Sequence, residues 1–343
     1  MPENTFAHDV PLVAVLRGEY VGSLHRGSVA VASADGKLRA SLGNPLEAVF
    51  LRSAAKPFQV MPAVLSGGIE HFDLTTRELA VLCSSHSGEP RHREAVLSVL
   101  RKIGLDESTL HCGVHPPISE TAARDMWRSG GDPSPVCNNC SGAHASMLLA
   151  ARAMGWTIES YGDIRHPLQQ MTLEILSGFA EIDTDRIEFA VDNCAVPTFR
   201  LPLLNAATAF ARLATGEALE TRLKHAAARV REAMMKYPEM IAGEDRFDTE
   251  LMRAADGTLL CKGGAEAFQG MGSLTKGLGI ALKISDGNAR AVPPAATKIL
   301  SDLALVDDTM RARLAAYIRP KQQTWGGEMV GSLETVFSLG ESF

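Results

Sequence analysis

The stretch GSVAVASADGKLRASL, residues 27–42, decides the class of fold. Apolar residues alternate with small and polar ones on either side of Asp35-Gly36, a dipeptide that favours tight hairpin turns. The stretch therefore predicts two antiparallel strands joined at that pair. The apolar run at residues 12–16 predicts a further strand shortly before it. The first 52 residues thus predict one part of a sheet.

The pattern turns helical after residue 53 and returns to strands near the C-terminus. Segments 89–103 and 198–215 have the apolar spacing of helices, whereas 258–261 and 279–284 have that of strands. We also expect residues 290–292 to pair back as a hairpin strand.

These segments together predict an α+β fold in which both chain ends build one sheet around a helical middle. We expect residues 1–343 to form a single catalytic unit. Its sheet-forming parts would be 1–52 and 257–343, and its mainly helical part 53–256.

Composition limits the classes of function. The 343 residues are 45% hydrophobic and 22% charged, as in globular chains, and the formal net charge is −6. An acidic balance without long basic runs argues against nucleic acid as the partner. No apolar run is long enough to span a membrane, and residues 1–10 lack the features of a signal peptide. We therefore expect a cytoplasmic location, and six reduced cysteines of which some could bind metal.

The first candidate for chemistry is Ser53-Ala-Ala-Lys56, which follows Arg52. Ser-x-x-Lys on a helix places a hydroxyl and an amine one turn apart. A partly desolvated lysine can then accept the serine proton and create a nucleophile. In the alternative interpretation, Ser53 only caps a helix and Lys56 is a solvated charge.

Two other polar segments follow the same logic. The loop that contains Ser85 and His86 offers hydroxyls and an imidazole, or simply begins a helix. Lys262 ends a predicted strand before two glycines, which leaves backbone open to a ligand; otherwise it is an exposed edge charge. The order Ser-x-x-Lys, serine loop, Lys-Gly-Gly is similar to the penicillin-recognising signature and indicates acyl transfer at an amide.

A third group contains thiols. Cys137-x-x-Cys140, His144 and the distant Cys194 could bind Zn²⁺ through sulfur and nitrogen. Without a metal these cysteines would be buried thiols.

At this point the sequence resembles the Rhizobium etli-type (class 3) L-asparaginases, the asparaginase II family. The resemblance covers most of the chain, and its motifs lie at residues 52–57, 83–87, 112–116, 139–144, 192–197, 238–244 and 283–288.

The resemblance implies an L-asparagine amidohydrolase with a serine β-lactamase/glutaminase-like fold, built as a homodimer. Ser53 would be the nucleophile and Lys56 its base, while Ser85 and Lys262 would form a second pair that relays protons. The expected substrate-binding residues are Arg52, His86, Asp192 and Glu244.

The resemblance also implies a zinc site beside the substrate, with Cys140 and Cys194 as ligands. The family has a third ligand, a lysine, where this chain has Ala143. Because a methyl group cannot bind a metal, we expect weak zinc binding or none.

Other functions stay open at this stage. They are a zinc-dependent hydrolase that uses the thiols and His144, a glutamine-preferring amidohydrolase, a β-lactamase-like hydrolase, and a non-catalytic protein that binds an amino acid.

Overall fold

A computed structural model describes residues 6–340, which form two compact units. Unit 1 consists of the residues up to Ala54, of Arg200–Ala218, and of those from Glu250 onward. Unit 2 consists of Ala55–Phe199 and Leu219–Thr249. The chain thus passes from the first unit to the second between Ala54 and Ala55, inside the Ser-x-x-Lys motif.

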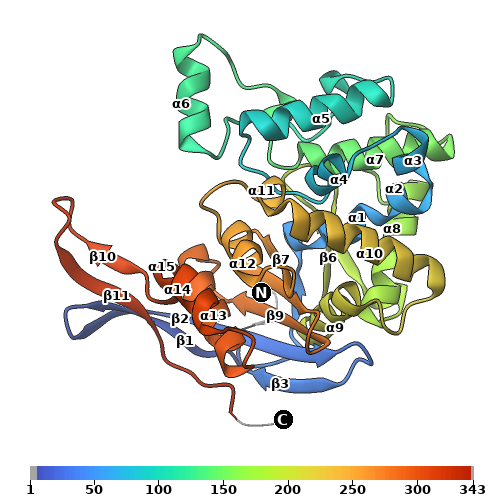
Figure 1. The fold of residues 1–343 in the computed structure, drawn as a ribbon. Coiled ribbons are helices and arrows are strands. Elements are labelled where there is room, and N and C mark those ends of the chain that lie inside the picture. Colours follow the sequence, from blue (N-terminus) through green and yellow to red (C-terminus); the bar gives the residue numbers. More distant parts are fainter. Residues whose placement is uncertain (1–5, 341–343) are drawn as a thin grey trace. The chain divides into compact units, whose positions relative to one another are not determined.

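Unit 1 is built on an antiparallel sheet made from both ends of the chain (Figure 1). Its strands lie in the order β10 (Lys321–Gln323), β11 (Met329–Thr335), β1 (Val10–Arg17), β2 (Tyr20–Ser33), β9 (Leu278–Ile284), β8 (Phe268–Ser273), β7 (Leu259–Gly264), and β3 (Leu38–Leu42) pairs with β2. N-terminal and C-terminal strands are direct neighbours, since β1 pairs with β11 and β2 with β9. The predicted α+β class and the sheet made from both ends are confirmed.

The predicted hairpin at residues 27–42 is confirmed. Val31 lies opposite Ala40, and Gly36 turns the chain with a φ of 76°, which glycine adopts at little cost. The N–H of Gly36 donates to Ser33 O at 3.0 Å and closes the turn.

Helix α9 (Leu203–Thr215) packs on this sheet against β2, β8 and β9. Glycines make that approach possible: a Cβ at Gly270 or Gly272 would overlap or crowd Phe210, and one at Gly279 would overlap Ala207 O. Helices α13 (Val292–Asp302), α14 (Asp308–Arg313) and α15 (Ala315–Ile318) complete the unit, with α13 against β1, β8, β9 and β11.

Two local predictions are wrong. Residues 290–292 form no strand, because a 3-10 turn at Ala289–Ala291 leads into α13 and two prolines fill its first turn. The segment 198–215 is not helical throughout, since β6 (Pro197–Pro202) precedes α9. Along β6, Arg200 pairs with Phe50 of β4 (Ala48–Phe50). Prolines at both ends of β6 and its Thr-Phe pair favour the extended chain.

Unit 2 is mainly helical, and α7 (Ser141–Met154) is its central helix. Most of α7 is buried, and it contacts α1, α2, α3, α4, α5 and α8. The other elements are α1 (Lys56–Gln59), α2 (Met61–Leu65), α3 (Gly68–His71), α4 (Thr76–Leu82), α5 (Pro90–Lys102), α6 (Glu120–Arg128), α8 (Pro167–Ala180), β5 (Glu188–Val191), α10 (Thr221–Lys236) and α11 (Pro238–Ile241); α12 (Phe247–Ala255) begins in unit 2 and ends in unit 1. Helix α5 lies where the sequence predicts one at 89–103.

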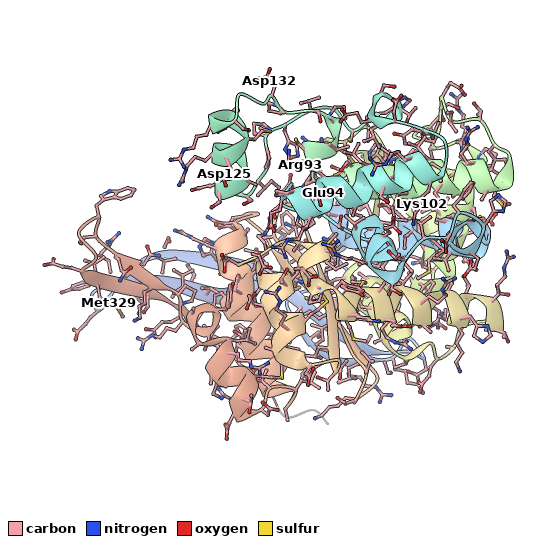
Figure 2. All side chains as sticks on the ribbon, turned by 45° about the horizontal axis from the view of Figure 1, so that its top comes forward. Arg93, Glu94, Lys102, Asp125, Asp132 and Met329 are labelled. Atoms are coloured by element: carbon pink, nitrogen blue, oxygen red, sulfur yellow. The ribbon has the colours of Figure 1, made fainter. Side chains whose placement is uncertain are left out.

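The pair α4–α5 holds the serine loop, residues 83–89, between two fixed helices. Thr75 caps α4, and Glu78 completes the capping box by accepting from the Thr75 N–H at 2.7 Å. Lys102, labelled at the end of α5 in Figure 2, donates to Glu78 at 2.8 Å and ties the two helices together. Both ends of the loop are therefore anchored.

Candidate active site

Ser53 lies in unit 1, on a strained turn after β4. The turn is a short 3-10 helix, Arg52–Ala55, and Arg52 has a φ of 50°, which non-glycine residues rarely adopt. Gly264 lets this turn approach β7, because a Cβ there would overlap Leu51 O. Such strain persists only where surrounding contacts impose it, and it is concentrated at functional sites.

Lys262 lies in the same unit on β7 and is buried, with 1% of its surface exposed. Its Nζ donates to the carbonyl of Gly263 at 2.8 Å. The interpretation of Lys262 as an exposed edge charge is therefore wrong. Gly264 places the end of β7 beside the Ser53 turn, so the two sequence motifs of unit 1 meet.

Lys56 begins unit 2 and is buried, with 3% of its surface exposed. Its Nζ donates to Ser85 Oγ at 3.3 Å and to Cys140 Sγ at 3.2 Å. Asn139 Nδ2 donates to the same Ser85 oxygen at 3.3 Å. The interpretation of Lys56 as a solvated charge is wrong, because its amine lies inside a cluster of polar side chains.

The thiols of Cys140 and Cys194 have pKa values shifted in opposite directions. A hydrogen bond with Cys194 and the charge of Lys56 lower the pKa of Cys140, although burial acts in the other direction. The same hydrogen bond, together with burial, raises the pKa of Cys194. We therefore expect any thiolate to reside on Cys140, which also lies at the N-terminus of α7.

His86 is buried with both ring nitrogens engaged. The N–H of Gly88 donates to its Nδ1 at 3.1 Å, so the proton lies on Nε2, which is 2.9 Å from Ser141 Oγ. The ring stacks on His92 at 5.0 Å, and burial lowers the pKa of His86. His86 thus holds the serine loop against the start of α7 as a neutral side chain.

Glu89 connects the serine loop to the segment that contains Glu244. Its Oε1 accepts from Ser87 Oγ at 2.6 Å and from the Glu244 N–H at 3.0 Å. Arg91 bridges the two carboxylates, 3.0 Å from Glu89 and 2.8 Å from Glu244. Hydrogen bonds and ion pairs therefore hold the 238–244 segment against the serine loop.

Gly243 lies at the closest point of that contact. Its φ is 117°, and a Cβ there would overlap Ser87 Oγ. We expect Gly243→Ala to lower the free energy of unfolding by about 2–4 kcal/mol, through backbone strain and overpacking together. Urea denaturation measures the loss. Gly130→Ala is the matched control, because Gly130 has a φ of 75° and open space around it; equal losses in both variants would refute the packing argument.

A cavity of about 1210 Å³ in unit 2 borders the serine loop and the 238–244 segment. Ser87, Glu89 and Glu244 line it, together with residues of α5 and α6. Figure 2 labels two of its charged side chains, Arg93 on α5 and Asp125 on α6. The predicted substrate residue Glu244 thus faces a space large enough for a small molecule.

The described residues contain no helix that is both long and apolar enough to cross a membrane. The family model described as L-asparaginase II matches residues 13–335, most of the chain. The chain belongs to the L-asparaginase II family.

No curated protein matches the L-asparaginase II chain significantly. A crystal structure of Mglu in its native form is 16% identical, with a TM-score of 0.48, and the match covers 82% of this chain and 66% of Mglu. A β-lactamase from Mycobacterium bovis is 12% identical, with a TM-score of 0.43 and coverage of 80% and 94%. The chain spans slightly less than two thirds of the length of that Mglu chain.

The zinc site expected from the resemblance does not fit the side chains of this L-asparaginase II chain. Cys140 has Lys56 Nζ at 3.2 Å, and Asn139 Oδ1 lies 3.3 Å from its sulfur. His144 Nδ1 is 2.7 Å from Tyr161 Oη, and within residues 6–340 no three His, Cys, Asp or Glu side chains are grouped to hold a metal. None of the six cysteines forms a disulfide, and all six are buried.

Two predicted substrate-binding residues of the L-asparaginase II chain remain, and each lies near other site residues of its unit: Arg52 in the turn that contains Ser53, and Asp192 near Cys140 and Cys194. Arg52 pairs with Glu266 at 3.0 Å in unit 1. Asp192 accepts from the Asn193 N–H at 2.6 Å in a turn of unit 2.

Sequence reasoning missed Asn139 and Glu89, which hold Ser85 and its loop. Asn139 lies between Cys137 and Cys140, and Glu89 is the last residue of the serine loop. Their sequence positions alone carried no sign of the partners they bind.

Proposed function

We propose that the chain hydrolyses the side-chain amide of L-asparagine to aspartate and ammonia through an acyl-enzyme. The observation that carries the proposal is the buried amine of Lys56, within hydrogen-bond distance of Ser85 and three residues after Ser53. An amine held within hydrogen-bond reach of a hydroxyl is placed to exchange a proton with it during a reaction. Family membership supports the amide as the bond that is cleaved.

In the first half-reaction Ser53 is the nucleophile and Lys56 the base. Lys56 accepts the hydroxyl proton while the oxygen attacks the amide carbon, and backbone N–H groups stabilise the oxyanion. The C–N bond then breaks, and the nitrogen takes the proton that Lys56 accepted, relayed by Ser85 and Lys262, so that ammonia leaves and Lys56 can again act as a base. Ser53 now carries the aspartyl group as an ester.

In the second half-reaction water replaces ammonia. Lys56 accepts a proton from water as its oxygen attacks the ester, and Ser53 recovers a proton when the C–O bond breaks. Arg52, Asp192 and Glu244 bind the charged ends of the substrate, whereas His86 acts as a positioning residue for the Ser85 loop. No step requires a metal ion in this scheme.

The substrate and the zinc requirement are tested together by measuring ammonia release from L-asparagine and from L-glutamine. We expect asparagine to be preferred, and activity to persist in chelator and not to rise with added zinc, because the thiols lack a third ligand. Activity that vanishes in chelator and returns with zinc would support the metallohydrolase instead. Faster release from glutamine would reassign the substrate, since one methylene separates the two amides.

Ser85 offers a prediction with a neighbouring control. We expect Ser85→Ala to lower kcat about 100-fold, because it removes the hydroxyl that accepts a hydrogen bond from the Lys56 amine. Ser84→Ala, one residue away, should leave kcat within about twofold, since Ser84 Oγ is buried without a hydrogen-bond partner in the described part of the chain. Steady-state kinetics at saturating asparagine distinguish the two, and equal kcat values for both variants would remove Ser85 from the mechanism.

We further propose that the chain is of the Rhizobium etli type, and acts as a cytoplasmic homodimer on a free small molecule, with neither nucleic acid nor a membrane as partner. Light scattering of the purified protein measures the oligomeric state; a monomer at assay concentration with full activity would contradict the dimer.

A further inference from the structure

A second cavity, of about 400 Å³, lies wholly in unit 1, and Arg52 alone among the residues of the mechanism above lines it. It is bounded by β4, by Arg200 of β6, by the β7–β8 turn and by the end of β9. The 283–288 motif supplies part of its wall, and the proposed function assigns that motif no role. The volume suits a ligand of amino-acid size.

The charged side chains of the cavity have both signs. Arg52, Arg200 and Lys283 supply positive charge, whereas Glu266 and Asp286 supply negative charge. A ligand that carries a carboxylate and an ammonium group matches such a set. Because Arg52, Arg200 and Lys283 all line the cavity, we expect the ligand to be recognised mainly through its carboxylate.

Two of the polar groups are held away from water. Lys283 is 8% exposed, and its Nζ donates to Glu266 O at 2.5 Å and to Ile284 O at 2.8 Å, which leaves one N–H for another acceptor. Ser285 lines the cavity, and its Oγ is buried with no hydrogen-bond partner in residues 6–340. A ligand carboxylate could satisfy both groups.

The cavity is connected to the nucleophile through Arg52. This residue lines the cavity, pairs with Glu266 at 3.0 Å, and directly precedes Ser53. Arg52, Glu266 and Ala267 all have positive φ, of 50°, 58° and 58°, so their turns depend on the contacts between them. A carboxylate that draws Arg52 from Glu266 would remove one of those contacts.

We propose that this cavity binds a free amino acid by its carboxylate and that the bound ligand lowers turnover by shifting the Arg52–Ser53 turn. The proposal rests on the proposed function for its probe, the product L-aspartate, and for Ser53 as the nucleophile, whereas the binding of the ligand does not depend on turnover. The site shares Arg52 with the proposed substrate site but differs from it otherwise, because neither Ser53 nor Lys262 lines the cavity.

Binding is tested by calorimetric titration of L-aspartate into the full chain with Ser53→Ala, so that the readout does not depend on turnover. We expect two classes of site, of which Arg200→Met removes one or weakens it about tenfold or more, as for loss of a charge-assisted hydrogen bond. Arg313→Met, on α14 and outside the cavity, is the control and should keep both classes. Binding that Arg200→Met leaves unchanged would overturn the proposal.

Kinetics then distinguish an effector site from a part of the substrate pocket. Aspartate should lower kcat for asparagine, and Arg200→Met should abolish that effect while KM stays unchanged. A raised KM with unchanged inhibition would assign the cavity to the substrate and overturn the proposal.

Ser285→Ala covers the case in which Arg200→Met unfolds. This variant should keep or raise the melting temperature, because it deletes an unsatisfied hydroxyl. It should still weaken the binding of L-aspartate to the class of site that Arg200→Met affects. If it leaves that affinity intact, the cavity is not the site. If the protein does not hydrolyse amides, the titration still decides whether the cavity binds L-aspartate.

Discussion

Replacing Ser53 with alanine is expected to lower ammonia release from L-asparagine by about a thousandfold or more while the protein stays folded. The residue is half-buried on the strained turn after β4, and the substitution removes only the oxygen that attacks the amide. Loss of a nucleophile removes the whole covalent route, so its effect exceeds that of any binding residue. Progress curves with coupled ammonia detection measure the change.

Two observations keep this result interpretable. The melting temperature should stay within a few degrees of the parent, and Ser66→Ala, in unit 2 at the end of α2, should retain full turnover. Mass spectrometry of acid-quenched parent enzyme should find an aspartyl adduct on the peptide that contains Ser53. Near-parental turnover in Ser53→Ala, or an adduct on the peptide with Ser85, would assign the nucleophile elsewhere.

Lys56→Met is expected to have the next largest effect, a loss of about 100- to 10,000-fold in kcat with a smaller change in KM. Methionine fills nearly the same space in the buried cluster but cannot accept the Ser53 proton or donate to Ser85. Because an amine that serves as a base acts in the transition state, the loss should fall on kcat. Steady-state kinetics and urea denaturation of the same preparation measure the two effects.

Lys102→Met is the matched lysine variant. It breaks the 2.8 Å ion pair with Glu78 and should lower the free energy of unfolding by about 1 kcal/mol without reducing kcat. If Lys56→Met and Lys102→Met lose turnover only in proportion to stability, Lys56 has a structural role and the mechanism fails.

The expectation of weak zinc binding or none depends on Ala143 and on the surroundings of Cys140. Ala143 removes a ligand, and the place next to Cys140 is held by Lys56 at 3.2 Å. The hydrogen bond with Cys194, and after it the interaction with Lys56, lower the pKa of Cys140 and so favour its thiolate.

Local sequence determined much of the fold. The Asp35-Gly36 turn and the alternation around it were sufficient for the β2–β3 hairpin, because turn geometry and side-chain period are properties of neighbouring residues. Strand β8 and the β10–β11 pair went unpredicted. In β8, Gly270 and Gly272 replace the apolar residues of an ordinary strand so that α9 can approach, a reason that lies in another element.

For the candidate site too, some features follow from the sequence and others only from the tertiary structure. Sequence by itself selected Ser53, Lys56, Ser85 and Lys262 as candidates, since a motif is a matter of residue type and spacing. Only the tertiary structure decided that Lys56 and Lys262 are buried, that Asn139 binds Ser85, and that Glu89 joins its loop to Glu244. Burial and hydrogen-bond partners arise from residues brought together over 54 to 155 positions of chain, and no local pattern encodes those contacts.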